Sequence, residues 1–281
     1  LQIWVAGGTY KPKYTPEDGQ SLSATPADPR DVSFLMVNNV QLYGGFAATE
    51  TTLNERDLTL TANASILSGD LGIPNVDTDN AYHVVLRVGT PTTTLNAELN
   101  GFTITNGNAD GNTTIQVNAG IIQKSRGGGI YNIYTSSDIM NVKIIKNKAN
   151  YGAGMYNVDS QFKLINGLVV NNITTTEGGG IYNDSAGYVT VLNCTFYNNS
   201  LQDIHSTWGW MGVYNTILWD GIVGTNFADL TFNSCLFGVG LNALTVFTDA
   251  ANGDFSLVNG SPAINAGNNQ HWIANVGAIT G

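Results

Sequence analysis

The sequence predicts an all-β fold, a single-stranded parallel β-helix whose coils stack into a solenoid. The first observation is a motif that occurs three times: Gly127-Gly-Gly-Ile-Tyr-Asn132, Gly152-Ala-Gly-Met-Tyr-Asn157 and Gly178-Gly-Gly-Ile-Tyr-Asn183. Its asparagines are 25 and 26 residues apart. A fixed period of this size is typical of solenoids, whose repeats bury a core only by stacking on one another.

The second observation is the composition, which indicates a folded and mostly β chain. Of 281 residues, 42% are hydrophobic and only 11% are charged, and there are 33 glycines and 34 asparagines. A disordered chain would lack the many strand-forming residues, and a helical protein would have more Lys, Glu and Ala and less Gly and Asn.

The net charge argues against nucleic-acid binding, and the lengths of the apolar runs argue against a transmembrane helix. A net charge of −10 and a pI near 4.5 argue against nucleic-acid binding, which needs a basic face. No run of 18 apolar residues is present, so we expect no transmembrane helix.

Short apolar runs between turn-forming residues predict the strands of the N-terminal third. They are Ile3–Ala6, Val32–Val37, Val40–Tyr43, Ser65–Leu67, His83–Val88 and Phe102–Thr105. Irregular segments are expected at Thr9–Arg30 and Gly69–Asn80, and a short helix at Ala47–Leu58.

A second strand of the repeat becomes visible further along the chain. It aligns Asn141–Asn147, Asn166–Asn172 and Asn193–Asn199, with looser copies that start at Asn215 and Asn233. Each copy alternates apolar and polar residues and ends in a polar turn. About eleven coils stacked at ~4.8 Å would form a rod on the order of 50 Å long. Asn147, Asn172 and Asn199 are expected to form a hydrogen-bonded ladder at one corner.

These repeats resemble a known family. Gly128–Ile130 with Ile144–Asn147, Gly179–Ile181 with Phe196–Asn199, and the stretches Ile3–Pro12 and Gly260–Gly267 are similar to repeats of bacterial secreted and surface-exposed right-handed parallel β-helix proteins. That family includes the polymorphic outer-membrane proteins and the pectate-lyase-like "choice-of-anchor" group.

The resemblance implies a right-handed helix and a place outside the cell or on its outer surface. Residues 1–281 are expected to form one domain, a piece of a longer secreted protein whose N-terminal cap is missing. The family contains adhesins and polysaccharide-active enzymes, so the fold does not decide the function.

Two features predict a glycan-binding surface. Tyr131, Tyr156 and Tyr182 follow core-facing residues, so they are expected to point outward as an exposed row suited to stacking on sugars or on one another. Basic residues also gather between 124 and 163 and are expected to attract an acidic polysaccharide or surface glycan, or else to form a solvated face. They include Lys124, Arg126, Lys143 and Lys146.

Few residues suggest catalysis or metal binding. Asp70, Asp77 and Asp79 in one loop are candidates for a Ca²⁺ site, or simply cap turns, and no cofactor is otherwise required. With Arg87 they are the best candidates for a lyase or hydrolase site. His83 is expected to be packed, and His205 to be a surface substitution. Cys194 and Cys235 are two coils apart, too far for a disulfide, with Cys194 inward and Cys235 outward.

Three functions follow from these features. The first is a non-catalytic extracellular or cell-surface module, structural or adhesive, that binds glycans. The second is a polysaccharide lyase or glycoside hydrolase. The third is a subunit of an extracellular filament that associates end to end through open strand edges.

Overall fold

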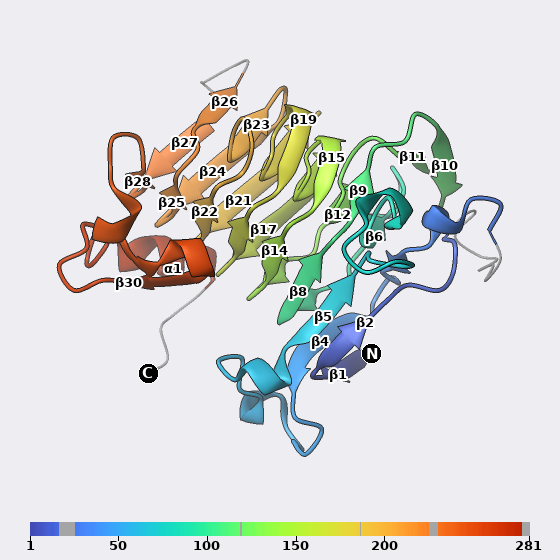
Figure 1. Cartoon of the computed structure of the whole chain (residues 1–281), viewed down its shortest axis with the longest axis horizontal. Coiled ribbons are helices and arrows are strands. Elements are labelled where there is room, and N and C mark those ends of the chain that lie inside the picture. Colours follow the sequence, from blue (N-terminus) through green and yellow to red (C-terminus); the bar gives the residue numbers. More distant parts are fainter. Residues whose placement is uncertain (17–25, 119, 186, 225–229, 277–281) are drawn as a thin grey trace.

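Parallel strands stack side by side along the long axis of the molecule (Figure 1). The computed structural model describes residues 1–16, 26–118, 120–185, 187–224 and 230–276. Among these residues only two pairs of strands are antiparallel, β10 (Thr114–Val117) with β11 (Gly120–Gln123) and β29 (Phe247–Asp249) with β30 (Asp254–Leu257). The predicted all-β parallel solenoid is therefore confirmed.

Three long sheets form the faces of the solenoid. The first contains β1 (Gln2–Ala6), β4 (Gln41–Phe46), β7 (Leu99–Asn100), β13 (Ile139–Met140), β17 (Gln161–Ile165), β21 (Tyr188–Leu192), β24 (Trp210–Tyr214) and β27 (Leu230–Asn233). The second contains β2 (Gly8–Tyr10), β5 (Ser65–Ser68), β8 (Phe102–Thr105), β14 (Lys143–Ile145), β18 (Leu168–Val170), β22 (Thr195–Tyr197), β25 (Ile217–Leu218) and β28 (Leu236–Phe237). The third contains β3 (Phe34–Leu35), β6 (Val85–Val88), β12 (Ile130–Ile133), β16 (Met155–Val158), β20 (Ile181–Asp184), β23 (Ile204–Ser206) and β26 (Ile222–Gly224).

Each coil visits the three faces in the same order. A short fourth sheet, β9 (Asn108–Ala109), β15 (Lys148–Tyr151) and β19 (Ile173–Glu177), lies between the second and third faces in the middle coils. The first two faces have eight strands each. The total of about eleven coils and the right-handed sense of winding stay predictions.

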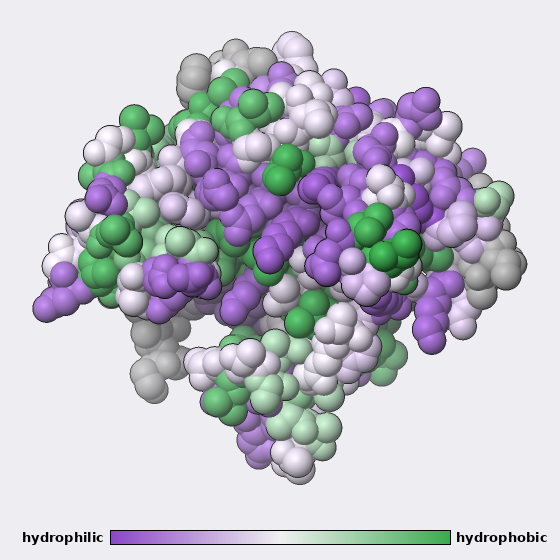
Figure 2. Space-filling view, viewed as in Figure 1, coloured by the Kyte–Doolittle hydropathy of each residue, from purple (hydrophilic) through white to green (hydrophobic). Residues whose placement is uncertain are grey.

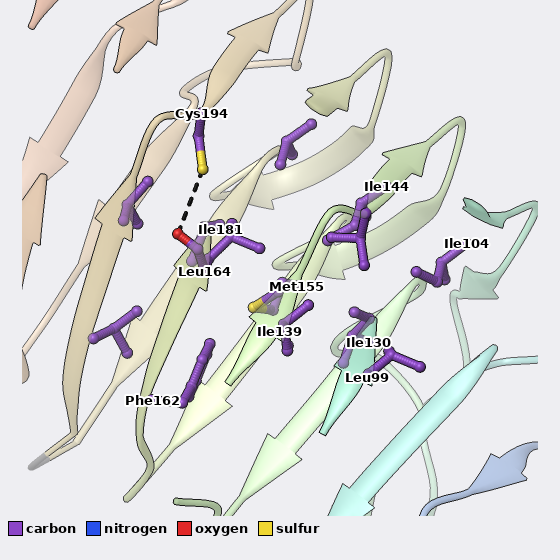
Figure 3. Packing of buried hydrophobic residues seen from close by; sticks show 14 of the residues in the cluster. Leu99, Ile104, Ile130, Ile139, Ile144, Met155, Phe162, Leu164, Ile181 and Cys194 are labelled. Carbon is purple, nitrogen blue, oxygen red and sulfur yellow. Dashed lines mark hydrogen bonds between the residues drawn. The ribbon is translucent and has the colours of Figure 1, made fainter. Parts of the chain in front are cut away.

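The fourth residue of the repeated motif, Ile or Met, forms the core, as predicted. Ile130, Met155, Ile181 and Ile204 pair in register on consecutive coils and are fully buried. They belong to one apolar cluster that runs along the stack, part of which Figure 3 shows. Because every coil contributes to this cluster, the coils stabilise one another rather than folding separately.

The predicted asparagine ladder is present at the next corner. Asn172 Oδ1 accepts from the backbone N–H and the side-chain amide of Asn147, each at 3.1 Å. Asn199 Oδ1 accepts the same two bonds from Asn172 at 3.2 and 3.0 Å. All three side chains are buried, so the ladder satisfies polar groups that water cannot reach.

Asparagine also supplies the left-handed backbone that other corners require. Asn141, Asn166 and Asn193 directly follow the first-face strands of consecutive coils, with φ of 52°, 53° and 54°. Asparagine tolerates this conformation better than most residues, which explains its abundance.

An insertion that the repeat alignment did not reveal produces the hairpin β10–β11. Gly107 and Asn147 occupy neighbouring coils but are 40 residues apart, whereas Asn147 and Asn172 are 25 apart. The additional residues form the hairpin, whose Ile115, Val117 and Ile122 pack outside the third face in a second apolar cluster.

The C-terminal part contains the only α-helix among the described residues, α1 (Asn269–Asn275), which was not predicted. Phe247 and Ala250 pack with Tyr197 and Trp219 over the second face. In the described residues the 3₁₀ turns are η1 (Pro29–Asp31), η2 (Leu53–Glu55), η3 (Thr61–Asn63), η4 (Asp77–Asp79), η6 (Ala243–Thr245) and η7 (Ala250–Asn252). None of the helices in the described residues is long and apolar enough to cross a membrane.

Two local predictions were wrong. The helix expected at Ala47–Leu58 is reduced to the short turn η2, consistent with its weak helical pattern. Part of the irregular segment Thr9–Arg30 lies outside the described residues, and its first residues belong to β2.

Both cysteines are free, as predicted, but Cys235 does not point outward. The pairing of β28 with β25 is shifted by one residue from the expected alignment. Because of this shift, Cys235 takes the same inward position that Cys194 takes two coils earlier. Its Sγ donates to Val213 O at 3.3 Å, and Cys194 Sγ donates to Leu164 O at 3.5 Å (Figure 3).

Candidate functional site

A polar groove of about 550 Å³ runs along one corner of the solenoid. Asn106, Lys146, Asn171 and Asn198 each follow the last residue of β8, β14, β18 and β22, which pair in register. All four have left-handed backbones, with φ between 53° and 60°. The stacking of the coils therefore lines up the same corner side chain from four consecutive coils.

A second row of side chains completes the groove. Lys148 and Ile173 are paired residues of β15 and β19, and Ser200 extends the row to the next coil through its N–H bond to Asn172 O. Asn75 and Asp77 come from the preceding loop and close one end. This loop is held in place because Asn108 Nδ2 donates to Asp77 O at 2.9 Å.

Four of the nine residues that line the groove are asparagines, so side-chain amides are its most frequent group. Asn198 Nδ2 donates to Asn171 Oδ1 at 2.7 Å, which leaves further donors and acceptors on both side chains. Lys148 forms an ion pair with Asp77. Lys146 is exposed and makes no ion pair within the described residues, and Ile173 adds an apolar side chain that is 48% exposed.

Hydrophilic side chains predominate over the middle of the face seen in Figure 2, and the hydrophobic ones form small separate patches. This distribution agrees with a surface whose exposed corners are mainly Asn, Ser and Thr. It offers hydrogen bonds rather than a large apolar contact.

The predicted exposed tyrosine row is wrong in one respect. Tyr131, Tyr156 and Tyr182 do stack outside the core, with ring centroids 5.1 and 5.3 Å apart. They are buried, however, at 2%, 0% and 8% exposure, in the apolar cluster that includes the hairpin β10–β11. This burial raises the pKa of Tyr131 to about 12. The row therefore presents no surface to a ligand.

The same column ends in His205, which was expected at the surface. Its ring stacks on Tyr182 at 4.7 Å, and it is only 4% exposed. Burial lowers the pKa of His205. The carboxylate of Glu177, with Oε2 3.6 Å from His205 Nε2, opposes this shift. His83 is packed as predicted, with Nδ1 3.0 Å from Gly127 O, and burial lowers its pKa to about 4.

Two of the predicted basic residues are neutralised by aspartates. Lys124 is almost buried, and its Nζ lies 2.6 Å from Asp31 Oδ1. Arg126 Nη1 lies 3.3 Å from Asp184 Oδ2, over the ring of Tyr156. Only Lys143 and Lys146 of the predicted set remain exposed without an ion pair in the described part of the chain, and only Lys146 lines the groove.

The three aspartates of the predicted calcium site face different partners. Asp70 Oδ1 lies 3.5 Å from Lys11 Nζ, Asp77 pairs with Lys148, and Asp79 Oδ2 accepts from Ile73 N at 2.7 Å. Within the described residues, no group of three or more His, Cys, Asp or Glu side chains is placed to hold a metal ion.

Arg87, the predicted basic partner of these aspartates, lies inside the solenoid. It is fully buried and donates to Asn132 Oδ1 at 3.0 Å and to Ser137 Oγ at 2.8 Å. Burial lowers its pKa to about 9. This buried side chain therefore does not form one surface site with the three aspartates.

Sequence reasoning missed most of the groove. Asn171 and Asn198 were treated only as repeat residues, and Ile173 and Ser200 were not singled out. A signal was present, because each ladder asparagine is preceded by a polar residue that must face the other way. Lys146 and Asp77 were singled out, although for separate sites.

Comparisons of this chain with protein-family models, curated proteins and solved structures found no match.

Proposed function

We propose that this chain is a non-catalytic extracellular or cell-surface module, structural or adhesive, that binds a glycan in the polar groove. The observation that carries the proposal is the row Asn106, Lys146, Asn171 and Asn198. These side chains repeat at the same corner of four consecutive coils and line one groove.

The spacing of the row suits an extended sugar polymer. Parallel strands stack at ~4.8 Å, so a chain that lies along the groove meets an equivalent side chain at each coil. Asparagine amides both donate and accept, as sugar hydroxyls do. Ile173 adds an apolar contact for the C–H face of a sugar ring.

The lack of a free carboxylate in the described groove lining supports the non-catalytic proposal. General acid–base catalysis needs a titratable group within hydrogen-bond reach of the substrate. Asp77, the one carboxylate in the groove lining, is occupied by Lys148. Arg87 and His83 are fully buried elsewhere.

The test is incubation with neutral and acidic polysaccharides, with binding and new chain ends measured in the same samples. We expect binding without product. The double variant Asn171→Gly with Asn198→Gly removes two amides while keeping backbones that accept φ > 0, and should weaken binding at least several-fold.

Asn166→Gly is the matched control, because Asn166 has the same φ at another corner of the stack. Product formation with turnover would overturn the non-catalytic proposal in favour of a lyase or hydrolase. Unchanged binding by the double variant would move the site away from the groove.

A further inference from the structure

We infer that the groove recognises a glycan with isolated anionic groups, such as one uronic-acid carboxylate flanked by neutral sugars. This inference rests on the proposed function and adds the charge pattern of the ligand. It follows from how charges are distributed over the coils that line the groove.

The positive charge available to a ligand comes from one coil. Lys146 and Lys148 belong to the same coil, and Lys148 is already paired with Asp77. With two lysines and one aspartate in the lining, the groove has the charge of a single free lysine. Lys146 is exposed and flexible, so it can pair with an anion that lies along the row.

The neighbouring coils are neutral at the equivalent positions. On the next coil Asn171 takes the place of Lys146, and Ile173 that of Lys148. The coil after that presents Asn198 and Ser200, and the coil on the other side presents Asn106. These positions offer amides, a hydroxyl and an apolar side chain, which suit neutral sugars and do not compensate a carboxylate.

A polymer with an anion on every sugar fits this pattern poorly. Its additional carboxylates would lie beside amides, Ile173 and Asp77, where no free cation compensates their loss of hydration. The net charge of −10 also repels a polyanion at long range. A neutral polymer fits the amides but leaves Lys146 without a partner.

The experiment compares three oligosaccharides of equal length by titration calorimetry at low and high salt. One alternates glucuronate with a neutral sugar, one consists only of galacturonate, and one is neutral cello-oligosaccharide. We expect the alternating oligosaccharide to bind best, by about fivefold at low salt, and high salt to remove this advantage.

Lys146→Asn isolates the cause, because asparagine already occupies this corner on the adjacent coils. It should remove the preference for the alternating oligosaccharide and leave the affinity for the neutral one unchanged. Lys143→Asn removes the same charge from the same coil outside the groove and should change neither.

The possible results separate the two proposals. Equal binding of the neutral and alternating oligosaccharides by the unmodified protein overturns the charge pattern but not glycan binding. Tightest binding of the all-galacturonate chain overturns it in favour of a polyanion site. If none of a wider polysaccharide panel binds either, both proposals fail.

Discussion

Arg87 donates a hydrogen bond to Asn132 inside the solenoid, with Nη1 and Oδ1 3.0 Å apart. The two residues are paired on neighbouring strands, β6 and β12. No carboxylate in the described residues forms an ion pair with this buried guanidinium, which is instead held by neutral acceptors and lies 5.5 Å from the ring centre of Phe162.

Replacing Arg87 with Met should lower the free energy of unfolding by about 3 kcal/mol, because acceptors on Asn132, Ala97 and Ser137 lose the donor that this fully buried side chain supplies. Arg87→Lys keeps the charge but loses the fork of donors, so an intermediate loss is expected. Denaturant unfolding measures both. Lys143→Met, an exposed change, should stay within about 0.5 kcal/mol of the original protein. A stability of Arg87→Met equal to the original would show that the buried charge costs as much as its hydrogen bonds contribute.

Replacing Asn172 with Ala should interrupt the ladder and lower the free energy of unfolding by about 2 kcal/mol. The N–H of Asn147 loses its acceptor, Asn172 Oδ1, and Asn199 Oδ1 loses the donor Asn172 Nδ2. Thermal and denaturant unfolding give the loss. The adjacent Asn171→Gly is the control, because Asn171 is only half-buried and its φ of 58° suits glycine. Similar losses for the two variants would mean that burial of the ladder does not matter.

Protonation of Asp203 should make the protein more stable as the pH falls from 7 to 4. Burial, with Asp220 close by, raises the pKa of Asp203 to about 7, from 3.8 in an unfolded chain. The folded protein thus keeps a proton that the unfolded chain has lost. The resulting stability is fully present below about pH 4 and is lost as the pH rises through about 7. The change is on the order of a few kcal/mol.

Unfolding by urea at several pH values measures this slope. Asp203→Asn should flatten it, because an amide does not titrate. Its single oxygen can accept from only one of Asn199 Nδ2 and Asp220 N, which both donate to the carboxylate. Asp159→Asn makes the same exchange at a half-buried position on another coil. A slope that survives Asp203→Asn would assign the pH dependence to other groups.

Cys194 should resist thiol reagents in the folded protein. It is buried, and burial raises the pKa of its thiol to about 12, so little thiolate exists near neutral pH. In the variant Cys235→Ser, a thiol-specific dye should react with Cys194 only as the protein unfolds. In denaturant it should label one thiol per chain. Rapid reaction under native conditions would contradict the inward position of Cys194.

The repeat period predicted the parts of the fold that each coil reproduces. Ile130, Met155 and Ile181 were placed in the core, and Asn147, Asn172 and Asn199 in a ladder, because identical coils must stack these residues in register. Burial of the tyrosine column could not be predicted in this way. Alternation along a strand shows that Tyr156 points away from the core, but not that a hairpin inserted elsewhere packs over the same sheet.

The candidate site was predictable only in fragments. Lys146 and Asp77 are far apart in sequence and come together because a loop of an early coil lies against the corner of later ones. The inward position of Cys235 was missed for a similar reason. β28, the last strand of the second face, is preceded by one residue more than the repeat alignment assumes. This extra residue changes which side chains of β28 face inward, and the loose alignment of the last repeats does not reveal it.

The hairpin β10–β11 shows that this solenoid accommodates additional residues at a small cost in loop-closure entropy. The chain closes a loop of 40 residues between Gly107 and Asn147, where the next coil needs 25. By polymer statistics, bringing the ends of the longer loop together costs only about 0.4 kcal/mol more in loop-closure entropy. Burying a single isoleucine contributes about 2 kcal/mol, and the hairpin buries Ile115 and Ile122 as well as Val117. A corner of the stack can therefore gain whole new elements, and with them new surface, without disturbing the register of the coils on either side.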